Sequence, residues 1–153
     1  MKPTDVMSSP APIGETLHRL LHGYRRVLRQ SYAEHHIRLA ISHIRVLKCV
    51  ARTNDATARQ IAEYMRQDKG RIARLLHDLE TEALIDRRPH AVDHRSRQLI
   101  LTEDGQALLE RIEAIETQTA TCMASGLSSR DLHRFNELAE SMIANLDQVQ
   151  DHS

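Results

Sequence analysis

The chain has 153 residues, of which 27% are charged and 41% hydrophobic, and its 21 Lys and Arg balance 21 Asp and Glu. This composition excludes an intrinsically disordered chain, and the length allows one domain with a hydrophobic core. Trp is absent and Phe occurs once, so we expect an aliphatic core.

Several cellular destinations are also disfavoured. The sequence has no run of about 18 apolar residues, which excludes a transmembrane helix. Its N-terminus lacks the apolar segment of a signal peptide. Two cysteines, Cys49 and Cys122, are too few for a disulfide framework. We therefore expect a cytoplasmic protein without membrane contact.

The charge is unevenly distributed along the chain. Residues 38–97 contain 13 Lys and Arg against 8 Asp and Glu, a net charge of +5, whereas residues 98–153 carry a net charge of −7. Such asymmetry fits a basic module on an acidic scaffold, although a chance arrangement on a solvated surface gives the same counts.

The first half of the chain predicts two helices. Residues 1–13 hold three of the four prolines, so we expect a flexible N-terminus. From Glu15 to Tyr32 apolar residues repeat at helical spacing, with a basic opposite face. From Ala40 to Arg52 apolar residues occupy more than one side, which indicates a central, buried helix.

Residues 57–105 have the pattern of a winged helix-turn-helix. Thr57 and Gln60 form a capping box for a short helix, and Asp68 is a suitable N-cap for the next one. Strands over 85–88 and 97–101 then flank a polar loop, as in a hairpin. We predict a mainly α fold with a small β-hairpin wing, that is, an α+β winged helix-turn-helix, and this fold reads duplex DNA.

The remaining helices exceed what a winged helix needs. Thr102 caps a long helix to about Ala124, and Ser128 or Ser129 caps a last helix with one apolar face. These helices and the first one have few partners within one chain, so we expect a homodimer, with a monomeric helical cap as the alternative. The predicted single domain spans 14–153, with a DNA-binding lobe at 38–102 and dimerisation helices at 14–37 and 103–150.

The run from Asp93 to Gly105, DHRSRQLILTEDG, resembles the wing signature of the multiple-antibiotic-resistance regulator (MarR) family. Upstream, Arg74, Leu76, Leu79-Glu80, Leu84-Ile85 and Arg87 are similar to the family's recognition helix and its exit. Two positions depart from the family pattern. Ala83 replaces a usual Gly, and a left-handed turn there would cost Ala about 1 kcal/mol, so we expect a turn of different shape. Gly70 replaces a usual Ser, Pro or Thr.

The resemblance implies that the helix after Asp68 enters the major groove, and the basic N-terminal end of that helix agrees. Lys69, Arg71 and Arg74 are the expected donors to bases, because Arg binds guanine bidentately. Gly70 permits a close backbone approach. The alternative is a solvated face on which Asp78 or Glu63 pairs with the arginines. Further expected DNA contacts come from the neighbouring helix and turn and from the wing tip: Arg59, Gln67, Asp93, His94, Arg95 and Arg97.

For the wing, a basic hairpin suits insertion into a narrow minor groove. Family resemblance implies that Asp93 orients Arg95 for this role, although the same pair could simply hold the shape of the hairpin. Relatives also bind small aromatic or phenolic acids between the dimer helices and the DNA-binding lobe. Residues that could line such a cleft here are Tyr24, Arg25, His43 and Arg45.

No catalytic residue set, phosphate-binding loop or metal-spaced Cys/His cluster is evident, so we expect neither an enzyme nor a cofactor or metal. His35, His36 and His43 keep a metal-sensing alternative open, and Cys49 or Cys122 a redox-sensing one. The main hypothesis is a dimeric, ligand-responsive transcription regulator, most often a repressor in this family, and the alternative is a winged helix that serves as a protein-interaction module.

Overall fold

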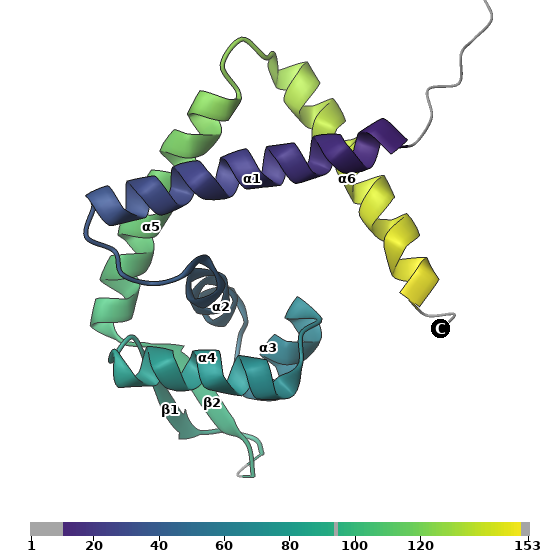
Figure 1. Cartoon of the computed structure of the whole chain (residues 1–153). Helices are drawn as coiled ribbons and strands as arrows, with labels where there is room; N and C mark the ends of the chain where they lie inside the picture. Colours follow the sequence, from purple (N-terminus) through teal and green to yellow (C-terminus); the bar gives the residue numbers. More distant parts are fainter. Residues whose placement is uncertain (1–10, 94, 151–153) are drawn as a thin grey trace, which may run out of the picture. The chain divides into compact units, whose positions relative to one another are not determined.

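The computed structural model describes residues 11–93 and 95–150. The fold is mainly α-helical with one small hairpin, as predicted (Figure 1). The chain divides into two compact units, the first ending at Glu116 and the second beginning at Thr117. In chain order the elements are α1 (Ala11–Glu34), α2 (Ile41–Arg52), α3 (Ala58–Met65), α4 (Lys69–Thr81), β1 (Ile85–Pro89), β2 (Arg97–Leu101), α5 (Glu103–Met123) and α6 (Ser129–Gln150).

The core of the first unit is aliphatic and is centred on α2, as the sequence indicated. Helix α2 buries Ile44, Val46 and Leu47 almost completely, and it packs against α3, α4 and β2. The largest fully buried side chains elsewhere in this core are Ile61, Ile72, Leu76, Leu79, Ile85 and Ile112. Burial of each such side chain contributes about 1.5–3 kcal/mol, so this core fixes where α4 and the hairpin lie.

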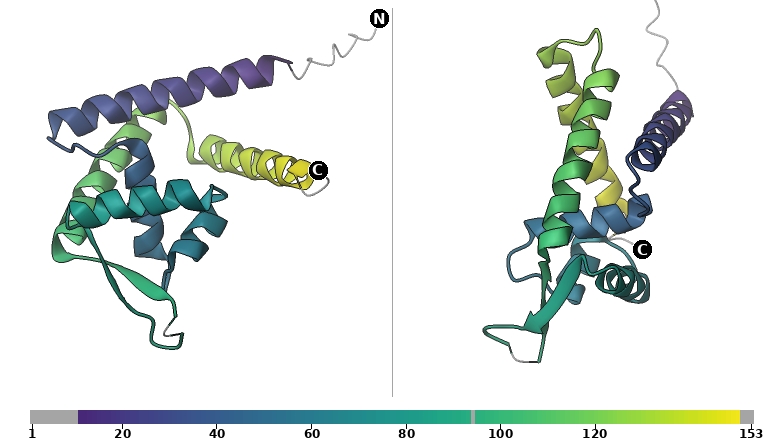
Figure 2. Two further views of the ribbon diagram at one scale, coloured as in Figure 1. Left: turned by 60° about the horizontal axis from the view of Figure 1, so that its bottom comes forward. Right: turned by 90° about the vertical axis from the view of Figure 1, so that its left-hand side faces the viewer.

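The hairpin is antiparallel, with Ile85 opposite Leu101 and Pro89 opposite Arg97. It projects from the lobe beyond α4 (Figure 2). The buried Leu99 anchors its base, because the Leu99 N–H donates a 2.7 Å hydrogen bond to the Ala56 carbonyl. The wing is therefore joined to the turn that precedes α3.

The predicted caps of α3 and α4 are confirmed. The Thr57 hydroxyl accepts from the Gln60 N–H at 3.3 Å, and the Gln60 side chain accepts from the Thr57 N–H at 3.0 Å. The Asp68 carboxylate accepts from the Arg71 N–H at 3.1 Å. These bonds satisfy backbone donors that a helix start leaves unpaired.

The turn after α4 corrects one expectation. Ala83 adopts the left-handed conformation, with φ of 56°, so the turn keeps the shape that a glycine would favour. The Leu84 N–H donates to the Leu79 carbonyl at 2.9 Å, a bond typical of a Schellman motif. The prediction of a differently shaped turn was wrong because this bond and the burial of Leu84 outweigh a strain of about 1 kcal/mol.

Thr102 and Gly105 lock the start of α5 onto this turn. The Thr102 hydroxyl donates to the Ala83 carbonyl at 2.6 Å and accepts from the Gly105 N–H at 3.0 Å, while the Thr102 N–H donates to the Leu84 carbonyl at 3.1 Å. A Cβ on Gly105 would lie 2.1 Å from the Leu84 oxygen. The Leu-Thr and Gly of the wing signature thus join α5 to the exit of the α4 turn.

Helix boundaries differ from the predicted ones by a few residues. Helix α1 begins at Ala11, four residues before the predicted start, because Pro12 is tolerated in a first helical turn. Residues 1–10 lie outside the described part of the chain. Of the two candidate caps for α6, Ser128 takes the role, since its hydroxyl accepts from the Asp131 N–H at 3.1 Å. Within residues 11–93 and 95–150, every helix is too short or too polar to cross a bilayer.

Candidate nucleic-acid interface and adjoining pocket

The N-terminal half of α4 presents a basic surface. Lys69, Arg71 and Arg74 are exposed, whereas Ile72 and Leu75 on the opposite side of the helix are buried. This separation follows from helical spacing, since residues three and four apart share a face. The structure therefore leaves three of the predicted DNA-contacting side chains exposed on α4, and Gly70 is exposed as well.

The acids that could neutralise these arginines are engaged elsewhere. The Asp78 carboxylate lies 2.8 Å from His43 Nε2, and the Glu63 carboxylate lies 3.0 Å from Arg59 Nε. Across the part of the chain that the structure describes, no ion pair involves the side chains of Lys69, Arg71 or Arg74. The pairing of these arginines with Asp78 or Glu63, considered as an alternative, does not occur among the described residues.

Two predicted contacts from the preceding helix and turn have other surroundings. Arg59 is exposed but forms an i,i+4 ion pair with Glu63, which a phosphate could replace because exposed pairs contribute little. Gln67 is partly buried and lines a pocket, where its Oε1 atom has no hydrogen-bond partner. The sequence predicted Gln67 as a DNA contact but gave no sign of its inward position.

The wing tip is held by side-chain bonds to its own backbone. The Asp93 carboxylate accepts from the Arg95 N–H at 3.0 Å and from the Ser96 hydroxyl at 3.2 Å. Asp93 thus binds the backbone of Arg95, and its carboxylate shapes the turn. Arg95 and Arg97 are exposed, and His94 lies outside the described residues.

His90 is a second organiser of the tip, which the sequence did not single out. Its Nδ1 atom accepts from the N–H groups of Val92 at 3.2 Å and Asp93 at 3.1 Å. A ring nitrogen that accepts two hydrogen bonds carries no proton itself, so the neutral ring has its hydrogen on Nε2. The only signal for this role in the sequence was the position of His90, which follows Pro89 and precedes the donors Val92 and Asp93 by two and three residues.

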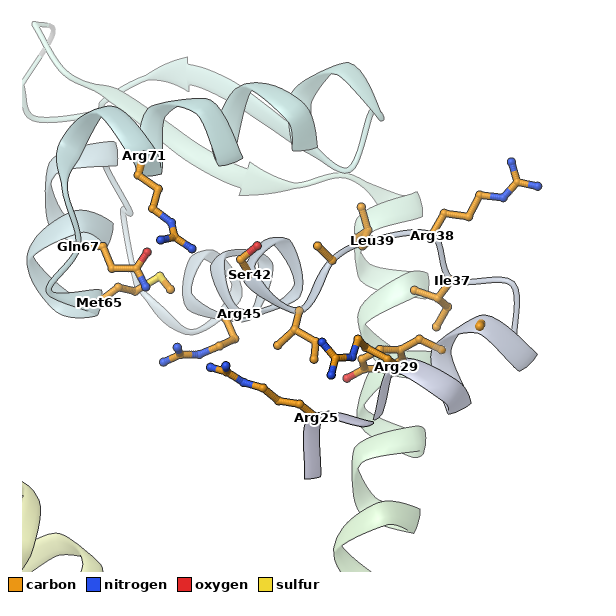
Figure 3. Close-up of a pocket in the computed structure, with 14 residues that line it drawn as sticks. Arg25, Arg29, Ile37, Arg38, Leu39, Ser42, Arg45, Met65, Gln67 and Arg71 are labelled. Carbon is orange, nitrogen blue, oxygen red and sulfur yellow. The ribbon is translucent and has the colours of Figure 1, made fainter. Parts of the chain in front are cut away.

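A pocket of about 560 Å³ adjoins this surface within the first unit (Figure 3). Of the four residues predicted to line an effector cleft, Arg25 and Arg45 do line it. Tyr24 and His43 do not: Tyr24 packs against the core, and His43 bonds Asp78. The sequence missed Arg29 and Tyr32, although Arg29 follows Arg25 at helical i,i+4 spacing.

Beneath the pocket, one carboxylate joins three helices. Glu116 of α5 accepts a 3.3 Å hydrogen bond from the Tyr32 hydroxyl of α1 and pairs with the Lys48 ammonium of α2. Burial of Tyr32 and the negative charge of Glu116 raise the pKa of the tyrosine well above its usual value. This network fixes Tyr32, which forms part of the pocket wall.

The sensing alternatives depend on the two cysteines and on His35, His36 and His43. Burial raises the pKa of the Cys49 thiol, an effect opposed by a hydrogen bond with Thr53 and by the charges of Arg45 and Arg52. Cys122 is exposed. Among the described residues there is no group of three or more His, Cys, Asp or Glu side chains that could hold a metal ion.

An outward-facing basic helix within a helix-turn-helix, next to a structured hairpin, defines a winged helix-turn-helix protein. Residues 39–96 match the sequence model of the MarR family. This match spans α2, α3, α4 and β1, so over that segment the chain is similar to MarR-family proteins.

Solved structures share the fold over most of the chain. The transcriptional regulator SlyA is 18% identical with a TM-score of 0.77, covering 89% of this chain and 94% of its own. A mutant MarR from E. coli complexed with operator DNA is 18% identical with a TM-score of 0.75, covering 91% and 99%. The S. aureus MepR–DNA complex is 19% identical with a TM-score of 0.75, covering 86% and 96%.

Proposed function

We propose that the chain is a sequence-specific regulator of transcription that binds double-stranded DNA as a homodimer, represses from a pseudo-palindromic operator and responds to a small ligand. The observation that carries this proposal is the group of exposed arginines on α4 that have no acidic partner, beside a hairpin with exposed Arg95 and Arg97. Two of the structurally similar proteins, MarR and MepR, were solved in complexes with DNA.

On DNA, α4 occupies the major groove and the wing reaches the adjacent minor groove. Arg71 and Arg74 contact base edges, and each bidentate pair with guanine contributes about 1–3 kcal/mol of discrimination. Lys69 and the backbone at Gly70 contact phosphates, as does Arg59 once it leaves Glu63. Arg95, on a turn fixed by Asp93, inserts into the minor groove, with Arg97 at the backbone. His94 and Gln67 complete the predicted contact set.

The dimer forms through α1 and α6. In the single chain α6 has no buried residue, and its apolar side chains are exposed, with Phe135 at 52% and Leu146 at 66%. Helix α1 also exposes Leu17, Leu20 and Leu21. Soluble proteins rarely leave such contiguous apolar faces in water, and a second copy covers both by symmetry.

The ligand occupies the pocket lined by Arg25 and Arg45. Because this pocket also includes Arg71 of α4, a ligand there contacts the same helix that reads DNA. The ligand class suggested by the family is an aromatic or phenolic acid, whose carboxylate matches a guanidinium group.

The test measures DNA affinity by fluorescence anisotropy, using the DNA upstream of the protein's own gene and unrelated DNA as the comparison. We expect selective binding. The logarithm of the association constant should fall linearly with the logarithm of the salt concentration, because phosphate contacts release counterions. Arg74→Ala should lower the selective affinity about 10-fold, and Arg26→Ala, an exposed arginine of α1, should not. Equal effects of the two substitutions, or no selectivity, would refute the proposal and favour a protein-interaction module.

A further inference from the structure

The pocket beside α4 is strongly cationic. Five arginines line it, namely Arg25, Arg29, Arg38, Arg45 and Arg71, and its lining includes no acidic side chain. They come from α1, the segment before α2, α2 itself and α4. In Figure 3, Arg71 reaches from α4 toward α2, and Arg25 and Arg45 extend toward the same opening, whereas Arg38 points away.

These positive charges are not balanced within the lobe. In the described residues, none of the five guanidinium groups forms an ion pair or donates a hydrogen bond to a protein acceptor. The arginines repel one another because they share one concave surface. A cleft lined by a single sign of charge also raises the local concentration of counter-ions. A ligand with one carboxylate would leave most of this charge unmatched, so the site favours at least two negative charges.

Most of the remaining lining is apolar. Tyr32, Ile37, Leu39, Ile41 and Met65 contribute hydrophobic surface, and the volume of about 560 Å³ lies in the range of small-molecule sites. The complementary molecule therefore has an apolar body and two anionic charges.

We propose that this pocket binds a small organic dianion, with two carboxylates or a phosphate ester on an apolar body, and that Arg71 is shared between this ligand and DNA. The proposal rests on the proposed function, because it assigns a ligand charge class and a mode of regulation to the same site. Arg71 is the third residue of α4 and also a pocket residue. One guanidinium group cannot bind both a pocket anion and a base in the major groove, so the dianion lowers DNA affinity by direct competition for Arg71.

The first test is isothermal calorimetry on the full chain without DNA. The probes are phthalate, benzoate and benzamide, which keep one ring and carry two, one and no negative charges at pH 7.5. We expect phthalate to bind ~10-fold or more tightly than benzoate, and benzamide not to bind. Arg25→Ala should weaken phthalate binding ~10-fold, while Arg26→Ala on the same helix should leave it unchanged. Equal affinities for phthalate and benzoate, no phthalate binding, or no effect of Arg25→Ala would overturn the assigned charge class.

The second test examines the coupling at constant ionic strength. Phthalate should weaken selective DNA binding by the wild type, and Arg25→Ala should need about 10-fold more phthalate for the same effect. Arg71→Ala should bind DNA less tightly and respond to phthalate less than the wild type does. A full phthalate response in Arg71→Ala would refute the sharing of Arg71. If the wild type shows no selective DNA binding, the proposed function fails, while calorimetry still decides whether the pocket binds a dianion.

Discussion

Gly105 at the start of α5 offers a sharp test of how the wing is joined to the helical scaffold. A Cβ at this position would lie 2.1 Å from the Leu84 oxygen and 3.0 Å from the Leu84 carbonyl carbon. Both neighbours are backbone atoms, so Gly105→Ala can be accommodated only if α5 and the α4 turn move apart by roughly 1 Å. The Leu84 carbonyl also accepts the Thr102 N–H, and this hydrogen bond would be stretched or lost.

The expected loss of stability combines three effects. Overpacking costs about 1–3 kcal/mol, and a weakened hydrogen bond costs about 0.5–1.5 kcal/mol. Replacing Gly by Ala in a helix returns up to about 1 kcal/mol. The free energy of unfolding should therefore fall by about 0.5–3.5 kcal/mol, which lowers Tm by about 2–4 °C per kcal/mol for a chain of this size.

Urea denaturation followed by circular dichroism would measure the change. Ala107→Gly is the matched control, because Ala107 is an exposed residue of the same helix. That substitution should cost about 1 kcal/mol and so measures the helix-propensity effect alone. If Gly105→Ala were as stable as the wild type or more stable, the close approach of α5 to Leu84 would be refuted.

Three further predictions concern other parts of the first unit and the free thiols. Ala83→Gly should raise stability by up to about 1 kcal/mol, because Gly adopts the φ of 56° without strain; a loss of stability in thermal unfolding would argue against the left-handed turn. Tyr32 has a folded-state pKa above its usual 10.0, so the stability linked to it is fully present below pH 10 and lost as pH rises further. Unfolding free energies measured between pH 9 and 11 should therefore decline less steeply for Tyr32→Phe than for the wild type, whereas Tyr64→Phe, at an exposed position, should match the wild type. With a chromogenic disulfide reagent at neutral pH, Cys122 should react rapidly and Cys49 only slowly, since Cys49 is buried and burial raises its pKa; rapid reaction of both thiols in the folded protein would contradict this.

The elements were predictable where the sequence carries local signals. Thr57 and Gln60 predicted the start of α3, and Asp68 predicted the start of α4. Both predictions were possible because capping depends on residues three apart. The hairpin followed from alternation and a polar loop. The aliphatic stripes of α1 and α6 also appeared in the sequence, because helical periodicity does not depend on which surface covers them.

The features that were missed depend on residues far apart in the chain. The Tyr32–Glu116 bond joins residues 84 positions apart, and the pocket combines arginines of α1, α2 and α4. Periodicity gives the face of each helix but not which faces meet, so the sequence did not show that Arg29 lines the pocket or that Tyr24 and His43 lie outside its lining. Ala83 was misjudged because tertiary packing overrode a local preference.

Methylation interference on the upstream DNA tests the central claim most directly, since methylation of guanine N7 blocks the atom that an arginine contacts in the major groove. The wild type should show interference at guanines in two symmetry-related half-sites, centred about 10 bp or a multiple of it apart. In Arg74→Ala, interference should disappear at the guanine that Arg74 contacts in each half-site and persist at the others. Interference that is absent, confined to one half-site, or identical in the two proteins would contradict the account of α4 as the reading helix.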